Sequence, residues 1–289
     1  MHAPWRESGD PYEVLVAAVM AQQTQMSRVL PSYERFIAAF PTIESLVAAS
    51  AGDVIRVWAG MGYNQRAIRL RRAARRIVES GWPHDAASLA QIDGIGPFTA
   101  AIIASFAFGE PAACVDTNVR RVLGRLCGDE TIDGKRLQAL ADTALAAGEP
   151  ARWNQALMDY GARVCTIRPK CAACVVARWC PSRREQPAAN GRRTPAALLL
   201  VADERATYSA RPRSKRQSKF EGSARWWRGR IVDALRALPA GGSMTIPALG
   251  RVLASSADAP AGAELSALIG ALETHGLVVV KGRRVALPD

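Results

Sequence analysis

Between residues 11 and 164, apolar residues recur every three or four positions, which is the spacing of one buried face of an α-helix. Helix starts are predicted at Thr42, where Ser45 follows in the first turn, and at Asp133. No stretch before residue 190 alternates as a β-strand does. The pattern therefore predicts an all-α body. Its helical stretches are marked by Leu15 and Val19; Leu30, Tyr33 and Ile37; Ile68, Ala73 and Ile77; and Val119, Leu123 and Leu126.

The pattern changes after the helical body. Residues 186–219 are rich in Arg, Pro, Ala and Ser and predict a basic linker. Residues 220–289 contain three helix-like stretches and then two short apolar runs, typical of a hairpin. This order predicts a small winged-helix-like α+β domain. Its third helical stretch carries Glu264 and Glu273 but no Arg or Lys, so a DNA contact and a packing role both remain open.

The composition indicates a folded, basic protein. The 289 residues are 49% hydrophobic and carry a formal net charge of +12, without a long Lys/Arg block at either end. A basic surface favours nucleic acid as a partner, although an Arg-rich coding bias gives the same composition. No apolar run is long enough for a membrane span or a signal peptide. We therefore expect no membrane contact and a cytoplasmic, nucleoid-associated protein.

Four of the six cysteines are clustered in the sequence, at Cys165, Cys171, Cys174 and Cys180. The spacing C-x5-C-x2-C-x5-C is that of metal ligands more than of disulfides in a chain of this length. Four thiolates suit either zinc or a 4Fe-4S cluster, and the spacing alone does not decide between them. The two remaining cysteines are predicted to be small core residues.

A Gly-Ile-Gly-Pro-Phe-Thr run lies between two helical stretches, at residues 94–99. Gly94 and Gly96 allow backbone N–H groups to approach a phosphate at a helix start, although a plain helix-to-helix turn has the same composition. Asp116 follows about twenty residues later and precedes another helix. It is either an N-cap or a carboxylate that stabilises positive charge on a sugar during glycosidic bond cleavage.

These motifs resemble the helix-hairpin-helix DNA glycosylases, in which the hairpin is followed by an essential aspartate at the start of a helix. The runs 19–25, 60–63 and 153–159 are similar to the MutY branch, whose members remove mispaired adenine. The resemblance covers residues 4–181. It implies a six-helix barrel with an iron-sulphur cluster domain over residues 1–185. It also implies a monomer acting on double-stranded DNA with a mispaired or damaged base.

The resemblance assigns roles to individual residues. Asp116 would be catalytic, and Asn118 would hold its carboxylate or the substrate. Gln155 matches the residue that reads the adenine edge, and Arg6 matches another residue of the base pocket. The remaining matches are to DNA-binding residues of the family. Gly94, Gly96 and Thr99 match residues of the hairpin, and Gln23 and Tyr63 match residues that are inserted into the base stack. The family's C-x6-C-x2-C-x5-C cluster favours 4Fe-4S over zinc.

Two positions in the expected base pocket depart from the family pattern. Phe98 stands where a lysine would attack the sugar, so the resemblance implies a monofunctional glycosylase without lyase activity. Ala18 stands where a glutamate would protonate the departing adenine. The resemblance to the MutY branch nevertheless makes adenine removal the leading expectation. Removal of uracil, thymine or alkylated purines, and non-catalytic mismatch or lesion binding, are the alternatives.

Overall fold

The computed structural model describes residues 3–183, 220–254 and 259–289, which form two compact units. The first unit contains the described residues up to Pro83, the segment Gln91–Ile95 and the described residues from Phe220 onward. The second contains His84–Ala90 and the described residues from Gly96 to Arg183. The basic linker predicted at residues 186–219 lies outside the described residues.

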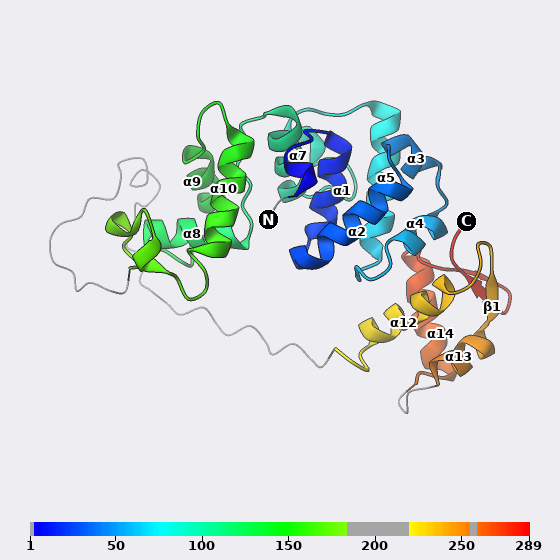
Figure 1. The fold of residues 1–289 in the computed structure, drawn as a ribbon. Coiled ribbons are helices and arrows are strands. Elements are labelled where there is room, and N and C mark those ends of the chain that lie inside the picture. The colour runs from blue at the N-terminus through cyan, green and yellow to red at the C-terminus, as the bar shows by residue number, and fades with distance from the viewer. Residues whose placement is uncertain (1–2, 184–219, 255–258) are drawn as a thin grey trace. The chain divides into compact units, whose positions relative to one another are not determined.

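The first unit begins with a bundle of helices around α1 (Figure 1). Its α1 is almost wholly buried, which explains why its apolar residues show no single face. Asp10 caps α1, because its Oδ1 accepts hydrogen bonds from the backbone N–H groups of Tyr12 and Glu13. The helix start predicted at Thr42 is confirmed, and there Thr42 and Ser45 form a reciprocal capping box. The elements are η1 Pro4–Arg6, α1 Pro11–Ala21, α2 Met26–Ala39, α3 Ile43–Ala48, α4 Ala51–Val57 and α5 Gln65–Ser80.

The C-terminal part of the first unit is a three-helix, three-strand module. The sheet order is β1-β3-β2, all antiparallel, with Val285 of β3 opposite both Met244 and Val280. The hairpin of β2 and β3 was predicted, whereas β1 was not, because three half-buried residues are too few to alternate. The elements are α12 Ala224–Arg236, β1 Ser243–Thr245, α13 Ile246–Leu253, α14 Gly262–Thr274, β2 Val279–Lys281 and β3 Arg284–Ala286.

This module shares a core with the helices that precede it. Ile55 of α4 and Ile68 of α5 lie in the same buried cluster as Ile231, Leu235 and Ile269. Hydrogen bonds reinforce the packing, since Arg236 donates through Nε to the Ile55 carbonyl at 2.9 Å. The module is therefore a part of the first unit by its packing.

The second unit is entirely helical in its described residues. Its core joins α8, α9 and the segment before α8, and includes Val119, Leu123, Leu137 and Leu140. Asp133 caps α9, as predicted. The elements are α6 Ala86–Leu89, α7 Pro97–Phe108, α8 Thr117–Cys127, α9 Gly134–Thr143, α10 Pro150–Arg163, η2 Cys171–Ala173 and η3 Ala177–Trp179. The predicted all-α body is thus confirmed.

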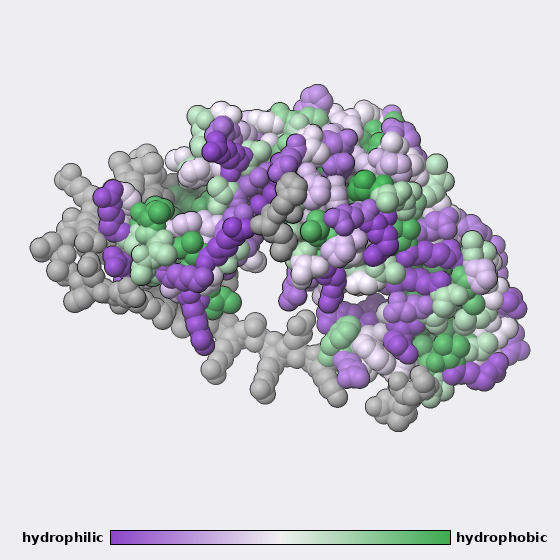
Figure 2. All heavy atoms as spheres, in the orientation of Figure 1, coloured by the Kyte–Doolittle hydropathy of each residue, from purple (hydrophilic) through white to green (hydrophobic). Residues whose placement is uncertain are grey.

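The surface mixes polar and apolar residues. Figure 2 shows hydrophilic and hydrophobic side chains interspersed over the face that it draws. In the described ranges, no helix has both the length and the apolar character needed to cross a bilayer.

One buried amide joins three segments of the second unit. The Asn154 side chain of α10 is 2% exposed and donates to the Ser105 hydroxyl of α7 and to the Ala112 carbonyl, both at 2.9 Å. Its Oδ1 accepts from the Cys114 N–H at 2.9 Å. Every polar atom of the amide head is therefore satisfied, and the chain leading to α8 is held in place.

We expect Asn154→Leu to lower the free energy of unfolding by about 2–4 kcal/mol, because it leaves buried backbone groups without partners. Urea denaturation followed by circular dichroism measures the change. The matched control is Gln155→Leu on the same helix, where we expect a change of about 0.5 kcal/mol or less. Equal effects of the two substitutions would contradict the role given to Asn154.

Candidate functional site

The turn that precedes α7 contains the two glycines of the predicted hairpin. Gly94 has φ +94°, and a Cβ there would lie 3.0 Å from the Arg69 carbonyl oxygen, so glycine is required on both counts. Gly96 caps α7 with φ −80°, and a Cβ there would meet nothing within 4 Å. Open space above a helix start leaves its N–H groups accessible to an anion.

The next two predicted residues lie on the first turn of α7. Phe98 is 36% exposed, so its ring reaches the surface of the second unit. Thr99 is 1% exposed, so its side chain packs inside that unit and does not present a hydroxyl on the surface. Of the two, only Phe98 offers its side chain to a ligand.

Asp116 is held at the start of α8 by three hydrogen bonds. Its Oδ1 accepts from the backbone N–H groups of Asn118 at 2.8 Å and Val119 at 2.7 Å, which makes it the N-cap. Its Oδ2 accepts from Asn118 Nδ2 at 2.8 Å. Donors on both oxygens fix the plane of the carboxylate. The capping role and a chemical role are therefore compatible.

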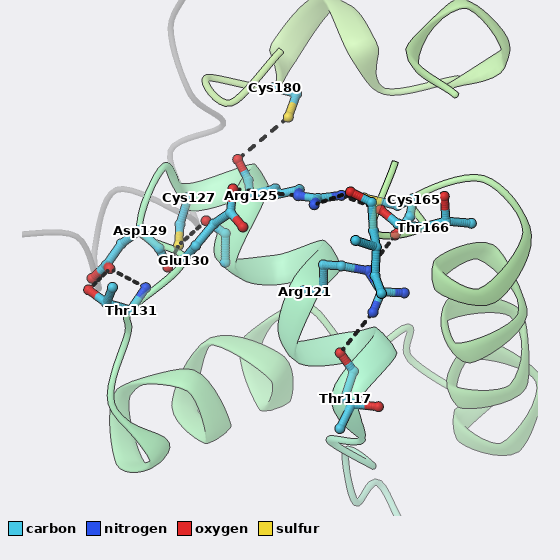
Figure 3. Close-up of polar contacts among 12 residues, drawn as sticks. Thr117, Arg121, Arg125, Cys127, Asp129, Glu130, Thr131, Cys165, Thr166 and Cys180 are labelled. Carbon is cyan, nitrogen blue, oxygen red and sulfur yellow. Dashed lines mark hydrogen bonds and ion pairs between the residues drawn. The ribbon is translucent and has the colours of Figure 1, made fainter. Parts of the chain in front are cut away.

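The Asn118 side chain is itself oriented by Arg121. Arg121 Nη2 donates to Asn118 Oδ1 at 2.8 Å and to the Gly161 carbonyl at 2.7 Å. Its Nε donates to the Cys165 carbonyl at 2.7 Å. Figure 3 shows the Arg121 side chain between the first turn of α8 and the Cys165 segment. One guanidinium group thus connects the Asp116–Asn118 pair to the cysteine-rich loop.

Close packing of α10 on α8 depends on Gly161. A Cβ at Gly161 would lie 2.7 Å from Asn118 Cβ and 3.0 Å from the Asn118 carbonyl oxygen. The first is closer than real Cβ contacts and the second is tighter than most of them, and the second is to backbone that cannot rotate away. Gly161 therefore sets the distance at which Asn118 and Arg121 meet α10.

The four clustered cysteines lie near one another in the second unit. Burial raises the pKa of the Cys180 thiol, and the other three thiols raise it further. Hydrogen-bond donors point at two of the sulfurs, since Arg125 Nη1 lies 3.5 Å from Cys165 Sγ and the Tyr160 hydroxyl lies 2.8 Å from Cys174 Sγ. Hydrogen bonds of this kind orient the sulfurs of metal-binding cysteines. Among the described residues, no three His, Cys, Asp or Glu side chains are close enough to surround a single metal ion.

In the first unit, Gln23 and Tyr63 have left-handed backbones, with φ values of +53° and +45°. Both are exposed, Tyr63 by 48%. Such conformations cost about 1–3 kcal/mol in non-glycine residues and persist only where the surroundings enforce them. The two strained residues lie on different loops, yet both line one cavity of this unit.

Arg66 holds the backbones of these two loops in place, and it was not predicted as a functional residue. Its Nη1 donates to the carbonyls of Val19, Met20 and Gln22 at 2.7–3.0 Å, just before Gln23. Its Nη2 donates to the carbonyls of Met61 and Gly62, just before Tyr63. Burial lowers the pKa of Arg66 to about 10, which still leaves it charged at neutral pH.

Ala18 and Arg6 also belong to the first unit, whereas Asp116, Asn118, Phe98 and Gln155 belong to the second. Ala18 is 8% exposed in α1 and offers only a methyl group. Arg6 ends η1 and is half-buried, as is Gln155 on α10.

The nearest acid to Ala18 in the sequence is Glu13, which is directed to a different neighbour. Burial, and then the Glu13 carboxylate, raise the pKa of the Tyr33 hydroxyl of α2. Tyr33 in turn packs edge-on against Trp5, with ring centroids 4.6 Å apart. Glu13 therefore belongs to the packing of α1 on α2.

We expect Gly161→Ala to lower the free energy of unfolding by about 1–3 kcal/mol, because the added methyl forces α10 away from Asn118. Chemical denaturation measures this. Gly270→Ala is the matched control, since it lies in α14 with open space around it and gains about 0.5–1 kcal/mol from helix propensity. A gain at both glycines would show that α8 and α10 are not in close contact.

We expect Arg66→Met to lower the free energy of unfolding by about 2–4 kcal/mol, because the carbonyls that it satisfies lose their partner. The same measurement on Arg76→Met, an exposed position of α5, should show about 0.5 kcal/mol or less. Hydrogen exchange should rise around Gln23 and Tyr63 in the Arg66 variant alone. Unchanged exchange there would refute the positioning role.

The HhH-GPD superfamily of base excision DNA repair proteins matches residues 16–145. The adenine DNA glycosylase of Mycobacterium tuberculosis is 34% identical over 246 residues, covering 81% of this chain and 73% of that protein. The human adenine DNA glycosylase is 38% identical over 199 residues, covering 63% of this chain and 36% of that protein. The chain thus spans about a third of the human relative and also of the Arabidopsis thaliana one, at 34%.

Solved structures are similar as well. A thermostable thymine-DNA glycosylase matches with a TM-score of 0.61 and 29% identity, covering 63% of this chain and 88% of that one. A trapped endonuclease III–DNA covalent intermediate matches with a TM-score of 0.55 and 23% identity, covering 63% and 86% of the two chains. The second likeness concerns the fold alone.

Proposed function

This chain belongs to the HhH-GPD superfamily of base excision DNA repair proteins, in the MutY-like branch of adenine DNA glycosylases, and we propose that it is a monofunctional DNA N-glycosylase. Its proposed substrate is double-stranded DNA with a mispaired base, first of all adenine opposite G or 8-oxoguanine. It acts as a monomer. We also propose that the sequence divides into a glycosylase part at residues 1–185, a linker, and a module at residues 220–289 that packs on α4 and α5.

The observation that carries the proposal is the carboxylate of Asp116. Both of its oxygens are fixed by Asn118 and the α8 backbone, so it is a rigidly oriented carboxylate at a helix start. As the bond between sugar and base breaks, its electron pair leaves with the base and the sugar acquires positive charge. An oriented carboxylate stabilises that charge, and water then adds to the sugar carbon.

Phe98 supports hydrolysis without strand cleavage. Strand cleavage requires an amine that attacks the sugar and forms a covalent intermediate. A phenyl ring has no such nucleophile, and the side chain at the start of α7 is the phenyl ring of Phe98. The product is then an abasic site in an intact strand.

The methyl group of Ala18 cannot protonate the departing base. A missing general acid typically costs about 10² to 10⁴-fold in rate. Glu13 does not supply the missing general acid, because its carboxylate lies against Tyr33. We therefore propose slow adenine release that is raised by restoring an acid at position 18.

The four cysteines fit a 4Fe-4S cluster better than one zinc ion. Their spacing is similar to the cluster motif of the glycosylase family, and four thiolates are the ligands of such a cluster. The thiols of Cys165, Cys171 and Cys174 also lie close enough to Cys180 to raise its pKa. When bound, a cluster would pin the loop that Arg121 and Arg125 hold, and its role here is structural.

Thymine or uracil is the second candidate for the excised base. The likeness to a thymine-DNA glycosylase structure favours it, as does Ala18, because these bases leave more easily without protonation. A non-catalytic mismatch or lesion binder is the third. The mispair panel that follows separates all three.

We expect single-turnover release of adenine from duplexes with A:8-oxoG or A:G, and none from Asp116→Asn, which removes the charge but keeps the shape. Ala18→Glu should raise the rate by about 10-fold or more, within the range for a general acid. Chromatography of released bases from A, T:G, U:G and hypoxanthine duplexes measures this. Asp116-dependent release of T or U alone would favour the second candidate, and no release from any duplex the third.

A further inference from the structure

A cavity of about 650 Å³ lies within the first unit, between its N-terminal loops and its C-terminal module. Gln23 and Tyr63 line one side, and Phe220, Arg225 and Arg228 line the other. The volume is in the range of roughly 300–1,000 Å³ that is usual for small-ligand sites. It is therefore large enough for a single nucleotide.

The cavity is strongly basic. Besides the buried Arg66, its lining includes Arg28, Arg69, Arg225 and Arg228, and no Asp or Glu is among the described residues that line it. Like charges that converge without a carboxylate repel one another, and an anion relieves that repulsion. Arginine is also the side chain best suited to phosphate, through its planar fork of donors.

The same cavity carries two exposed aromatic rings. Tyr63 is 48% exposed and Phe220 is 53% exposed. The Arg225 guanidinium lies 4.8 Å from the Phe220 ring centroid and 5.7 Å from that of Tyr63, and donates to the Tyr63 hydroxyl at 3.3 Å. Aromatic faces next to arginines are the combination that holds an unstacked base and its phosphate.

The helix that contributes these arginines is α12, not α14. Arg225 and Arg228 are one turn apart and face the cavity from the start of α12. The third helix, α14, offers Leu272 to the lining, and its Glu273 accepts from the Val280 N–H at 2.9 Å. Glu273 thus ties α14 to β2.

The position of α12 is fixed by Arg236 at its other end. Arg236 Nη2 donates to Asn64 Oδ1 at 2.7 Å, next to Tyr63, and its Nε donates to the Ile55 carbonyl. Arg56 of α4 donates back to the Pro239 carbonyl at 3.1 Å. The arginines of α12 are therefore held against the loop that presents Tyr63.

We propose that this cavity is a DNA subsite in which Arg225 and Arg228 of α12 hold a backbone phosphate and the Tyr63 ring covers the adjoining base. The proposal rests on the proposed function, which supplies DNA as the ligand. It makes α12 the DNA-contacting helix of the C-terminal module.

The test compares two double variants in the full-length protein carrying Asp116→Asn. Arg225→Ala with Arg228→Ala removes the two side chains that are proposed to bind the phosphate. Arg230→Ala with Arg251→Ala removes the same charge from α12 and α13, at exposed positions that do not line the cavity. The probe is a fluorescent duplex with one A:8-oxoG pair, whose Kd is measured by anisotropy over a series of salt concentrations.

We expect the cavity variant to bind about 10-fold more weakly and its salt slope to fall by about 2, while the control pair stays within about 2-fold of the parent. Arg225→Lys with Arg228→Lys keeps the charge and should recover most of the affinity. Equal losses in the cavity and control pairs would overturn the subsite, as would a cavity variant that binds like the parent.

A second measurement locates the phosphate. Single methylphosphonate linkages, which lack the phosphate charge, are placed along both strands of the probe. At least one linkage should weaken the parent protein but not the cavity variant. Identical interference patterns would overturn the proposal. Both measurements record DNA binding, whereas the mispair panel records base release. A failure of base release would therefore refute the proposed function, and the subsite would still be tested by the binding data.

Discussion

The guanidinium group of Arg121 is the interaction on which the candidate site depends. It donates to Asn118 Oδ1, to the Gly161 carbonyl and to the Cys165 carbonyl, so it joins α8, α10 and the cysteine loop at one point. Asn118 passes this orientation to the Asp116 carboxylate. A half-buried cation with all these partners is stable only when the surrounding backbone is in place. The geometry of Asp116 is thus a property of the whole unit.

The first unit uses the same physical device. Arg66 donates to the carbonyls of Val19 and Met20 near the end of α1 and to the Met61 carbonyl before Tyr63. The strain at Gln23 and Tyr63 is offset by these hydrogen bonds. In both units an arginine of a helix organises loops that belong to distant parts of the sequence.

The C-terminal module extends this arrangement. Its core includes Ile55 and Ile68, and its Arg236 bonds to the residue after Tyr63. A module that shares a hydrophobic core with α4 and α5 is held more rigidly than one on a tether. The charge of α12 is thereby placed at a fixed site beside an exposed tyrosine.

The sequence by itself determined the helices, their N-terminal caps and the candidate catalytic and metal-binding side chains. Apolar spacing and capping residues act over a few positions, so Thr42, Asp133 and the Asp116 helix start could be read directly. The cysteine spacing identified the four candidate metal ligands, and the resemblance added Asn118 and Gln155. Short-range signals were sufficient for all of these.

Only the tertiary structure decided which residues support the candidates. Arg66 lies on the buried face of α5 with Leu70, Ala73 and Ile77. It is a charged residue at a helical position where an apolar one is expected, and the spacing of apolar residues does not explain it. Asn154 and Gly161 look like ordinary helix residues until α7 and α8 are packed against α10. Their partners lie tens of residues away, and hydrogen bonds over such separations exist only after the helices have packed.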